Sequence, residues 1–243
     1  MKQTIFTITE HTPLTATVYR MVLTGDTDGI ATGQFVNILL DGLYLRRPIS
    51  VCDCQGDTLT LLYKVVGKGT AQMAAMIAGQ TLDLLTGLGN GYDLSKAGDK
   101  PLLIGGGVGV PPLYMLARQL REQGKAVSVI LGFNTADEVF YEQEFKALGC
   151  DVTVTTADGS HGVKGFVTAA LPADYSYFYT CGPEPMLKAV YKATATSGQF
   201  SFEERMGCGF GACMGCSCKV ITGYKRICKD GPVLEKEEIL WDA

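Results

Sequence analysis

The sequence predicts an antiparallel β-barrel domain, an α/β domain with a parallel sheet, and a loop-rich C-terminal segment. Three observations indicate this division. Short strand-like stretches dominate residues 1–98, strands and helices alternate over residues 99–200, and glycine and cysteine are dense over residues 201–243. A chain of 243 residues with 47% hydrophobic content is long enough to form two small cores.

The N-terminal part contains stretches in which apolar and polar residues alternate, as in strands with one buried face. Turn residues separate these stretches, which favours a small closed barrel. One helix is expected, from Thr70 to Ala78, with Gly79 ending it. The expected strands cover residues 1–9, 15–23, 34–40, 58–66 and 81–85.

The middle of the chain alternates between apolar strands and helices. This order predicts parallel strands wrapped by helices. The longest uncharged apolar stretch, residues 101–117, contains four glycines and three prolines, so it indicates a strand, a turn and a helix and not a membrane span. Strands are expected over 102–104, 126–131, 151–155 and 175–180, and helices over 112–122, 142–148 and 184–194.

Four cysteines near the C-terminus form the most informative pattern of the chain. Cys208, Cys213 and Cys216 have the spacing C-x4-C-x2-C, and Cys228 follows. This is the ligand spacing of a plant-type [2Fe–2S] cluster, which carries single electrons. The interval before Cys228 is shorter than in a plant-type ferredoxin, and Cys218, which lies within it, is interpreted as a packed thiol. A four-cysteine zinc site, a disulfide or free thiols are the alternatives, although zinc sites usually use two paired knuckles.

The overall composition excludes several other classes of protein. A net charge of −4 without a long basic run argues against a nucleic-acid partner. The N-terminus lacks the apolar core of a signal peptide, and nine cysteines in this pattern do not resemble a secreted disulfide scaffold. We therefore expect a protein of the reducing cytoplasm with no membrane contact. The two histidines, His11 and His161, have no catalytic partner pattern and are expected in surface or loop positions.

Three further motifs suggest ligand binding, although each is weak alone. Arg47–Ser50 is expected to close a strand, and its arginine is suited to a phosphate contact. Gly67–Thr70 opens the only helix of the barrel domain, where Thr70 would cap an anion-binding helix start. Gly105–Gly109 lies at a strand-to-helix turn where a dinucleotide can approach the backbone, but it does not match G-x-G-x-x-G. Each motif alone is explained more simply, as a tight turn or as a strand end with an exposed arginine. The interpretation as ligand-binding motifs therefore depends on their order along the chain.

In this order the chain resembles the ferredoxin–NADP reductase superfamily and, more closely, the electron-transfer subunits of dihydroorotate dehydrogenase B. The resemblance spans nearly the whole chain and is most specific in the cysteine segment. The matching stretches are Leu45–Ser50, Leu62–Lys64, Gly67–Thr70, Ile104–Leu113, Cys181–Met186, Glu204–Cys208 and Cys228–Pro232.

The resemblance implies an oxidoreductase subunit that holds FAD, a [2Fe–2S] cluster and NAD. Its partner would be an FMN-containing catalytic subunit that oxidises dihydroorotate in pyrimidine (UMP) biosynthesis, with two copies of each chain in a heterotetramer. Electrons would pass from FMN through the cluster and FAD to NAD⁺. The implied FAD contacts are Arg47, Pro48, Ile49, Ser50, Leu62, Tyr63, Lys64, Gly69 and Thr70, and the implied nicotinamide contacts are Gly105, Gly106, Gly107, Gly109, Cys181, Gly182 and Pro183.

The residues after the second α/β strand favour NAD over NADP. A 2′-phosphate needs a basic residue near that strand end, whereas Asp137 and Glu138 would repel it. The nearest rival function is the flavin and iron–sulfur subunit of another NAD(P)H oxidoreductase, such as a bifurcating ferredoxin:NADP reductase or a sulfhydrogenase. A rival of a different class is a zinc-stabilised interaction protein without activity.

Overall fold

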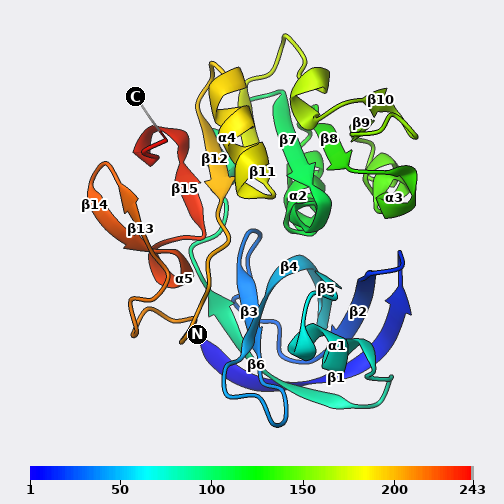
Figure 1. The fold of residues 1–243 in the computed structure, drawn as a ribbon, viewed down its shortest axis with the longest axis vertical. Coiled ribbons are helices and arrows are strands. Elements are labelled where there is room, and N and C mark those ends of the chain that lie inside the picture. The colour runs from blue at the N-terminus through cyan, green and yellow to red at the C-terminus, as the bar shows by residue number, and fades with distance from the viewer. Residues whose placement is uncertain (242–243) are drawn as a thin grey trace.

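The structure is a computed structural model, and residues 1–241 are described. Its lower half is a closed antiparallel barrel with the strand order β1-β2-β5-β4-β3-β6 (Figure 1). The barrel elements are β1 (Lys2–Pro13), β2 (Val18–Thr24), β3 (Phe35–Ile38), β4 (Arg47–Gln55), β5 (Thr58–Lys64), α1 (Lys68–Ala74) and β6 (Thr81–Leu88). The predicted barrel is confirmed.

Alternating side chains fill the barrel because successive residues of a strand face opposite sides. On β1, Phe6 and Ile8 are buried, and they meet Met21 and Leu23 of β2 in one core. Two details of the prediction are wrong. The Arg47–Ser50 motif does not close a strand but begins β4. The helix expected from Thr70 to Ala78 begins earlier and ends at Ala74, so Gly79 does not end it.

The upper half is an α/β domain with a seven-stranded sheet of order β10-β9-β8-β7-β11-β12-β15. All its strands are parallel except β15, which pairs antiparallel with β12 at the edge. The predicted parallel sheet is therefore confirmed, with one antiparallel addition. Its elements are β7 (Pro101–Gly106), α2 (Tyr114–Glu122), β8 (Ser128–Phe133), α3 (Glu142–Ala147), β9 (Asp151–Thr156), β10 (Val163–Lys164), β11 (Tyr177–Cys181), α4 (Glu184–Ala193), β12 (Gly198–Ser201) and β15 (Val233–Glu235). No helix within residues 1–241 has the length and apolar character needed to cross a membrane.

The C-terminal segment leaves the sheet after β12 and returns to it as β15. Between them lie the hairpin β13 (Ser217–Val220) and β14 (Gly223–Arg226) and the short helix α5 (Ile227–Asp230), on the left of Figure 1. The segment is not an independent unit, because Cys216, Ile227 and Cys228 belong to the same buried cluster as Phe200 and Leu234 of the sheet.

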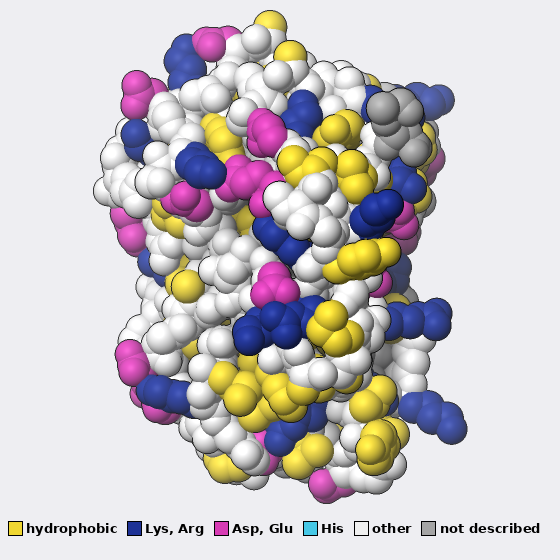
Figure 2. Space-filling model, turned by 90° about the vertical axis from the view of Figure 1, so that its left-hand side faces the viewer, with side chains coloured by type: hydrophobic (Ala, Val, Ile, Leu, Met, Phe, Trp, Pro, Cys, Tyr) yellow, Lys and Arg dark blue, Asp and Glu magenta, His cyan; other side chains and the backbone are white. Residues whose placement is uncertain are grey.

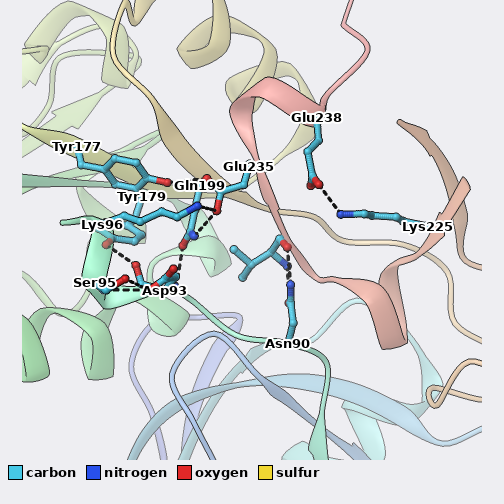
Figure 3. A network of polar contacts seen from close by, with 11 residues as sticks. Asn90, Asp93, Ser95, Lys96, Tyr177, Tyr179, Gln199, Lys225, Glu235 and Glu238 are labelled. Atoms are coloured by element: carbon cyan, nitrogen blue, oxygen red, sulfur yellow. Dashed lines mark hydrogen bonds and ion pairs between the residues drawn. The ribbon is translucent and has the colours of Figure 1, made fainter. Parts of the chain in front are cut away.

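Polar contacts, most of them partly buried, fix these parts to one another. Arg118 of α2 donates to Asp53 of β4 at 2.8 Å and so joins the two domains. On β15, Glu235 accepts hydrogen bonds from Lys96 at 2.7 Å, Gln199 at 2.8 Å and Tyr177 at 2.8 Å (Figure 3). Partial burial works against ionisation of Glu235, but these three donors outweigh it and lower the pKa of the carboxyl.

Candidate functional site

A cleft of about 870 Å³ lies between the barrel and the α/β domain. A smaller hollow of about 220 Å³ has Pro48, Ser50 and Pro183 among the residues that it shares with the cleft. Of the residues expected to bind a flavin, the cleft is lined by Arg47, Pro48, Ile49, Ser50, Leu62, Tyr63, Lys64 and Thr70. Of those expected to bind a nicotinamide, the hollow is lined by Gly106, Gly109, Cys181, Gly182 and Pro183. The two expected sites therefore open onto each other.

Lys and Arg side chains gather beside a carboxylate on the face of the molecule shown in Figure 2. They lie about midway between its upper and lower ends, with hydrophobic side chains above and below. The cleft itself has both charges in its lining, with Arg46, Arg47, Lys64, Arg205 and Lys219 as bases and Glu184, Glu203 and Glu204 as acids. A ligand with both phosphate and planar apolar groups suits such walls.

Two of the weak motifs meet in the structure. A methyl group added to Gly69 would lie 2.3 Å from Nε of Arg47, so the guanidinium of Arg47 lies directly across the loop that begins α1. Glycine is needed at this position to let the arginine approach, because any larger side chain would displace it. Gly69 itself does not line the cleft, because it packs against the Arg47 side chain, which does.

Thr70 does not cap α1 in the way the sequence suggests. The residue before the helix is Gly67, and Thr70 lies one turn inside. Its Oγ1 accepts from the backbone amides of Val66 at 2.9 Å and Gly67 at 3.2 Å, so these two amides are not available to a ligand. Arg47 is therefore the better candidate for an anion contact at this loop than the helix start alone.

The glycine turn after β7 is built for close packing against the end of β11. A methyl group on Gly109 would lie 2.3 Å from the carbonyl oxygen of Cys181, and one on Gly106 would lie 2.4 Å from Sδ of Met186. Gly105 packs against Val110, whereas Gly107 has a φ of 52° and open space where a side chain would be. Two glycines thus bring the turn beside Cys181–Pro183, and Gly107 leaves the backbone accessible to a ligand.

His11 lies in β1 and is partly buried, so the prediction of a surface or loop position is wrong for this histidine. Its Nδ1 is 2.7 Å from the carbonyl oxygen of Met76, and its Nε2 is 2.8 Å from the hydroxyl of Tyr63. Since a carbonyl only accepts, the neutral ring donates from Nδ1 and accepts the Tyr63 hydroxyl at Nε2. Tyr63, a wall of the cleft, is thereby held in place. His161 is exposed between β9 and β10, as expected.

The four cysteines of the spacing pattern are gathered as two pairs. The backbone amide of Cys213 lies 3.4 Å from Sγ of Cys208, and the two thiols interact directly. The amide of Cys228 lies 3.4 Å from Sγ of Cys216, and these two thiols also interact. Within residues 1–241, no three His, Cys, Asp or Glu side chains are grouped as ligands of one metal ion. Two thiolates for each of two irons is the donor set that a [2Fe–2S] cluster needs, so the pairs fit such a cluster.

Backbone amides favour the thiolate form of Cys208 in the first pair, which is the form that binds a metal. Burial opposes ionisation of the Cys208 thiol, but hydrogen bonds from the amides of Phe210, Cys213 and Ala212 outweigh it and lower its pKa to about 6. In the second pair, burial and the neighbouring Cys216 thiol raise the pKa of Cys228 to about 12. Metal binding would have to displace that proton. Cys218 is partly buried and has a raised pKa because of burial.

The sequence analysis missed several residues of the cleft. They come from the C-terminal segment and its approach from β12, namely Phe202, Glu203, Lys219, Leu240 and Trp241. Glu204, from a stretch matched to the family, and Cys218, interpreted as a packed thiol, also line the cleft. The only signal was the proximity of some of them to the cysteine motif. Their place follows from the return of the chain as β15, which sequence periodicity did not reveal.

The loop after β8 contains no basic residue over 132–138. Glu138 accepts hydrogen bonds from the backbone and side-chain amides of Asn134, at 3.2 and 2.9 Å. Asp137 is exposed. A 2′-phosphate would therefore meet a fixed carboxylate and a free one at this strand end.

Two models of known protein families match the chain. Residues 203–240 match the iron-sulfur cluster binding domain of dihydroorotate dehydrogenase B. Residues 103–192 match the oxidoreductase NAD-binding domain. The first match covers all four paired cysteines, and the second covers the glycine turn and Cys181–Pro183.

Solved structures share the fold. An NADH-dependent reduced ferredoxin-NADP oxidoreductase, studied for flavin-based electron bifurcation, superposes with a TM-score of 0.88 at 30% identity, covering 98% of this chain and 90% of that one. A ferredoxin NADP+ reductase from Neisseria gonorrhoeae with bound FAD and NADP has a TM-score of 0.69 over 79% of this chain and 90% of that one. At 19% identity it shows the fold alone.

Curated relatives are similar over nearly the whole length. The dihydroorotate dehydrogenase B (NAD(+)) electron transfer subunit of Geobacillus sp. (strain WCH70) is 42% identical, over 99% of each chain. The protein of the same name from Fusobacterium nucleatum is 45% identical, over 93% of this chain and 94% of that one. This chain therefore belongs to the family of dihydroorotate dehydrogenase B (NAD(+)) electron transfer subunits.

Proposed function

We propose that this chain passes electrons from a dihydroorotate dehydrogenase catalytic subunit, through a [2Fe–2S] cluster and FAD, to NAD⁺. One observation carries the proposal: the cleft, the hollow beside the glycine turn and the cysteine segment adjoin one another. Pro48 and Ser50 line both cavities, and Cys218, in the strand that follows Cys216, lines the cleft. Family membership supports the same assignment.

FAD is the group that the cleft would hold. Arg47, lying across Gly69, would bind the pyrophosphate, while Pro48–Ser50 and Leu62–Lys64 would line the flavin ring. Bound FAD would exchange electron pairs with a nicotinamide and single electrons with a cluster, which makes the chain a converter between the two. The protein supplies position: Tyr63, fixed by His11, keeps one wall of the cleft rigid.

NAD⁺ would enter beside the glycine turn, with its nicotinamide toward Cys181–Pro183. Burial raises the pKa of the Cys181 thiol to about 12. This side chain is therefore neutral at physiological pH and adds no negative charge beside a bound nicotinamide. The carboxylates of Asp137 and Glu138 after β8 favour NAD over NADP.

The catalytic partner would dock on the exposed side of the cysteine loop. Cys213 is exposed there, and so are the apolar side chains of Phe210 and Met214, which need a cover in an assembled enzyme. We propose that the partner carries FMN, that two copies of each chain assemble, and that the enzyme works in pyrimidine biosynthesis in the cytoplasm.

A paired assay tests the proposal. The chain alone should contain flavin, iron and sulfide and should oxidise NADH with an artificial acceptor, yet it should not reduce NAD⁺ with dihydroorotate. Adding the catalytic subunit should create that second activity, because the two flavins are then connected. Reduction of NAD⁺ by dihydroorotate in the isolated chain would refute this division of labour, and copurification with a ferredoxin-dependent partner would favour the bifurcating alternative.

A further inference from the structure

A buried asparagine lies between the barrel and the cysteine loop. Asn37 is 1% exposed and stands in β3, whose four residues are all buried. Asparagine is disfavoured in strands, and a buried amide oxygen without a hydrogen bond destabilises the folded state. Its Oδ1 has no hydrogen-bond partner among the described residues. A contribution to the stability of the barrel therefore does not explain why an asparagine occupies this position.

The nitrogen of this amide reaches the cysteine loop. Nδ2 of Asn37 donates to the backbone carbonyl of Cys208 at 3.3 Å. The next residue, Gly209, has a φ of 79°, and a methyl group there would lie 2.3 Å from the same Nδ2. The loop is thus shaped to rest directly on the asparagine, with glycine where any side chain would separate the two.

Asn37 also lies beside the flavin-binding part of the barrel. Its register partner on β4 is Pro48, which lines the cleft, and directly opposed residues of paired strands project from the same face. The guanidinium of Arg46 donates to the carbonyl of Asn37 at 3.2 Å and to the carboxylate of Asp83 at 2.9 Å. The strand that carries the amide is therefore itself held.

We infer that Asn37 is a positioning residue that seats the cluster loop on β3, beside the flavin-binding strand β4, and tunes the cluster through Cys208. This inference rests on the proposed function. The carbonyl of Cys208 marks the start of the turn whose amides, from Ala212 at 3.2 Å and Cys213 at 3.4 Å, point at Sγ of Cys208. Fixing the start of the turn keeps these amides directed at the sulfur. Hydrogen bonds to the sulfurs stabilise the more negative, reduced cluster and so raise its potential.

The test replaces the amide by an isosteric apolar group in the full-length, cluster-loaded chain. Asn37→Leu should lower the midpoint potential of the cluster, change its electron paramagnetic resonance spectrum, and speed iron release to a chelator by about 10-fold or more, as for other groups that support metal ligands. The flavin potential should stay unchanged. Asn37→Thr introduces a residue that is favoured in strands but too short to reach Cys208. It should also lower the cluster potential, and it replaces the leucine variant if that variant does not take up a cluster.

The matched control is Gln199→Met. Gln199 is another buried amide that joins separate segments, through Glu235 and the backbone of Asp93, and among the described residues its side chain has no hydrogen bond to the cysteine loop. It should lower thermal stability and leave the cluster potential as in the unmodified protein. Equal shifts of the cluster potential in the Asn37 and Gln199 variants, or no shift in the Asn37 variants, would overturn the inference about Asn37 but not the proposed function. An unmodified protein without an iron–sulfur signal would overturn the proposed function together with it.

Discussion

The barrel and the cysteine segment hold their site residues in opposite ways. In the barrel, Arg47–Ser50 and Leu62–Lys64 lie on strands whose backbones are already paired, so the barrel wall of the cleft is formed without a ligand. In the cysteine segment, Cys208 and Cys213 lie on a loop outside any strand or helix, and Cys216 directly precedes β13. Their sulfurs are arranged by backbone amides and by each other. One site precedes its ligand, whereas the other needs its ligand to be complete.

The largest expected effect separates the two sites outright. Replacing any one of Cys208, Cys213, Cys216 or Cys228 by serine should abolish or strongly destabilise the cluster, because each pair then lacks a thiolate. FAD content should stay near one per chain, because the barrel is paired without the cluster. Cys218→Ser is the control and should keep its iron. If Cys218→Ser loses iron while Cys228→Ser retains it, the fourth ligand is misassigned.

A second prediction compares two glycines of the turn after β7. Gly109→Ala should destabilise the α/β domain by roughly 2–4 kcal/mol, because its methyl group would strike the backbone of Cys181, which cannot move away as a flexible side chain would. Gly107→Ala meets open space and has only its positive φ to accommodate, at about 1 kcal/mol. Chemical denaturation of both variants measures the difference. Equal costs would show that close packing does not set this turn.

A third prediction concerns the preformed site. Arg47→Ala should weaken FAD binding about 10-fold or more, because a charge-assisted contact is worth about 1.5–3 kcal/mol. Lys68→Ala, at the exposed first residue of α1 and next to Gly69, should change the affinity much less. Flavin retained after extensive dialysis is the readout. Retention as in the unmodified protein would remove Arg47 from the site.

The smallest expected effect concerns how the cysteine segment is attached. Because the pKa of Glu235 is lowered in the folded protein, its contribution is present above the usual value of 4.5 and is lost as the pH falls through the lowered pKa. Glu235→Gln should therefore reduce the free energy of unfolding by about 1–2 kcal/mol at pH 7, with the difference shrinking toward pH 3. A difference independent of pH would show that the charge of Glu235 is not what matters.

Sequence reasoning succeeded where a local pattern carries the information. Alternation and glycine placement predicted the barrel and the parallel sheet, and the interval between cysteines singled out the four thiols that the structure gathers. It failed where distant segments meet. Local periodicity does not report packing between elements. Three features depend on such packing: the contact of Arg47 with Gly69, the hydrogen bond between His11 and Tyr63, and the antiparallel pairing of β15. Asn37 was missed for the same reason, since one polar residue in a strand reveals nothing until its neighbour from another segment is known.

The pairing of β12 with β15 has a consequence for how this protein is put together in the cell. Residues 202–232 form an excursion between two adjacent strands, and both ends are fixed by hydrogen bonds that involve no metal. We therefore expect the chain to complete its fold and take up flavin before a cluster is inserted, while Cys213 stands at the surface. Cluster delivery would then be a late step on a finished flavoprotein, and a short supply of iron and sulfide would limit electron transfer without limiting the amount of folded protein.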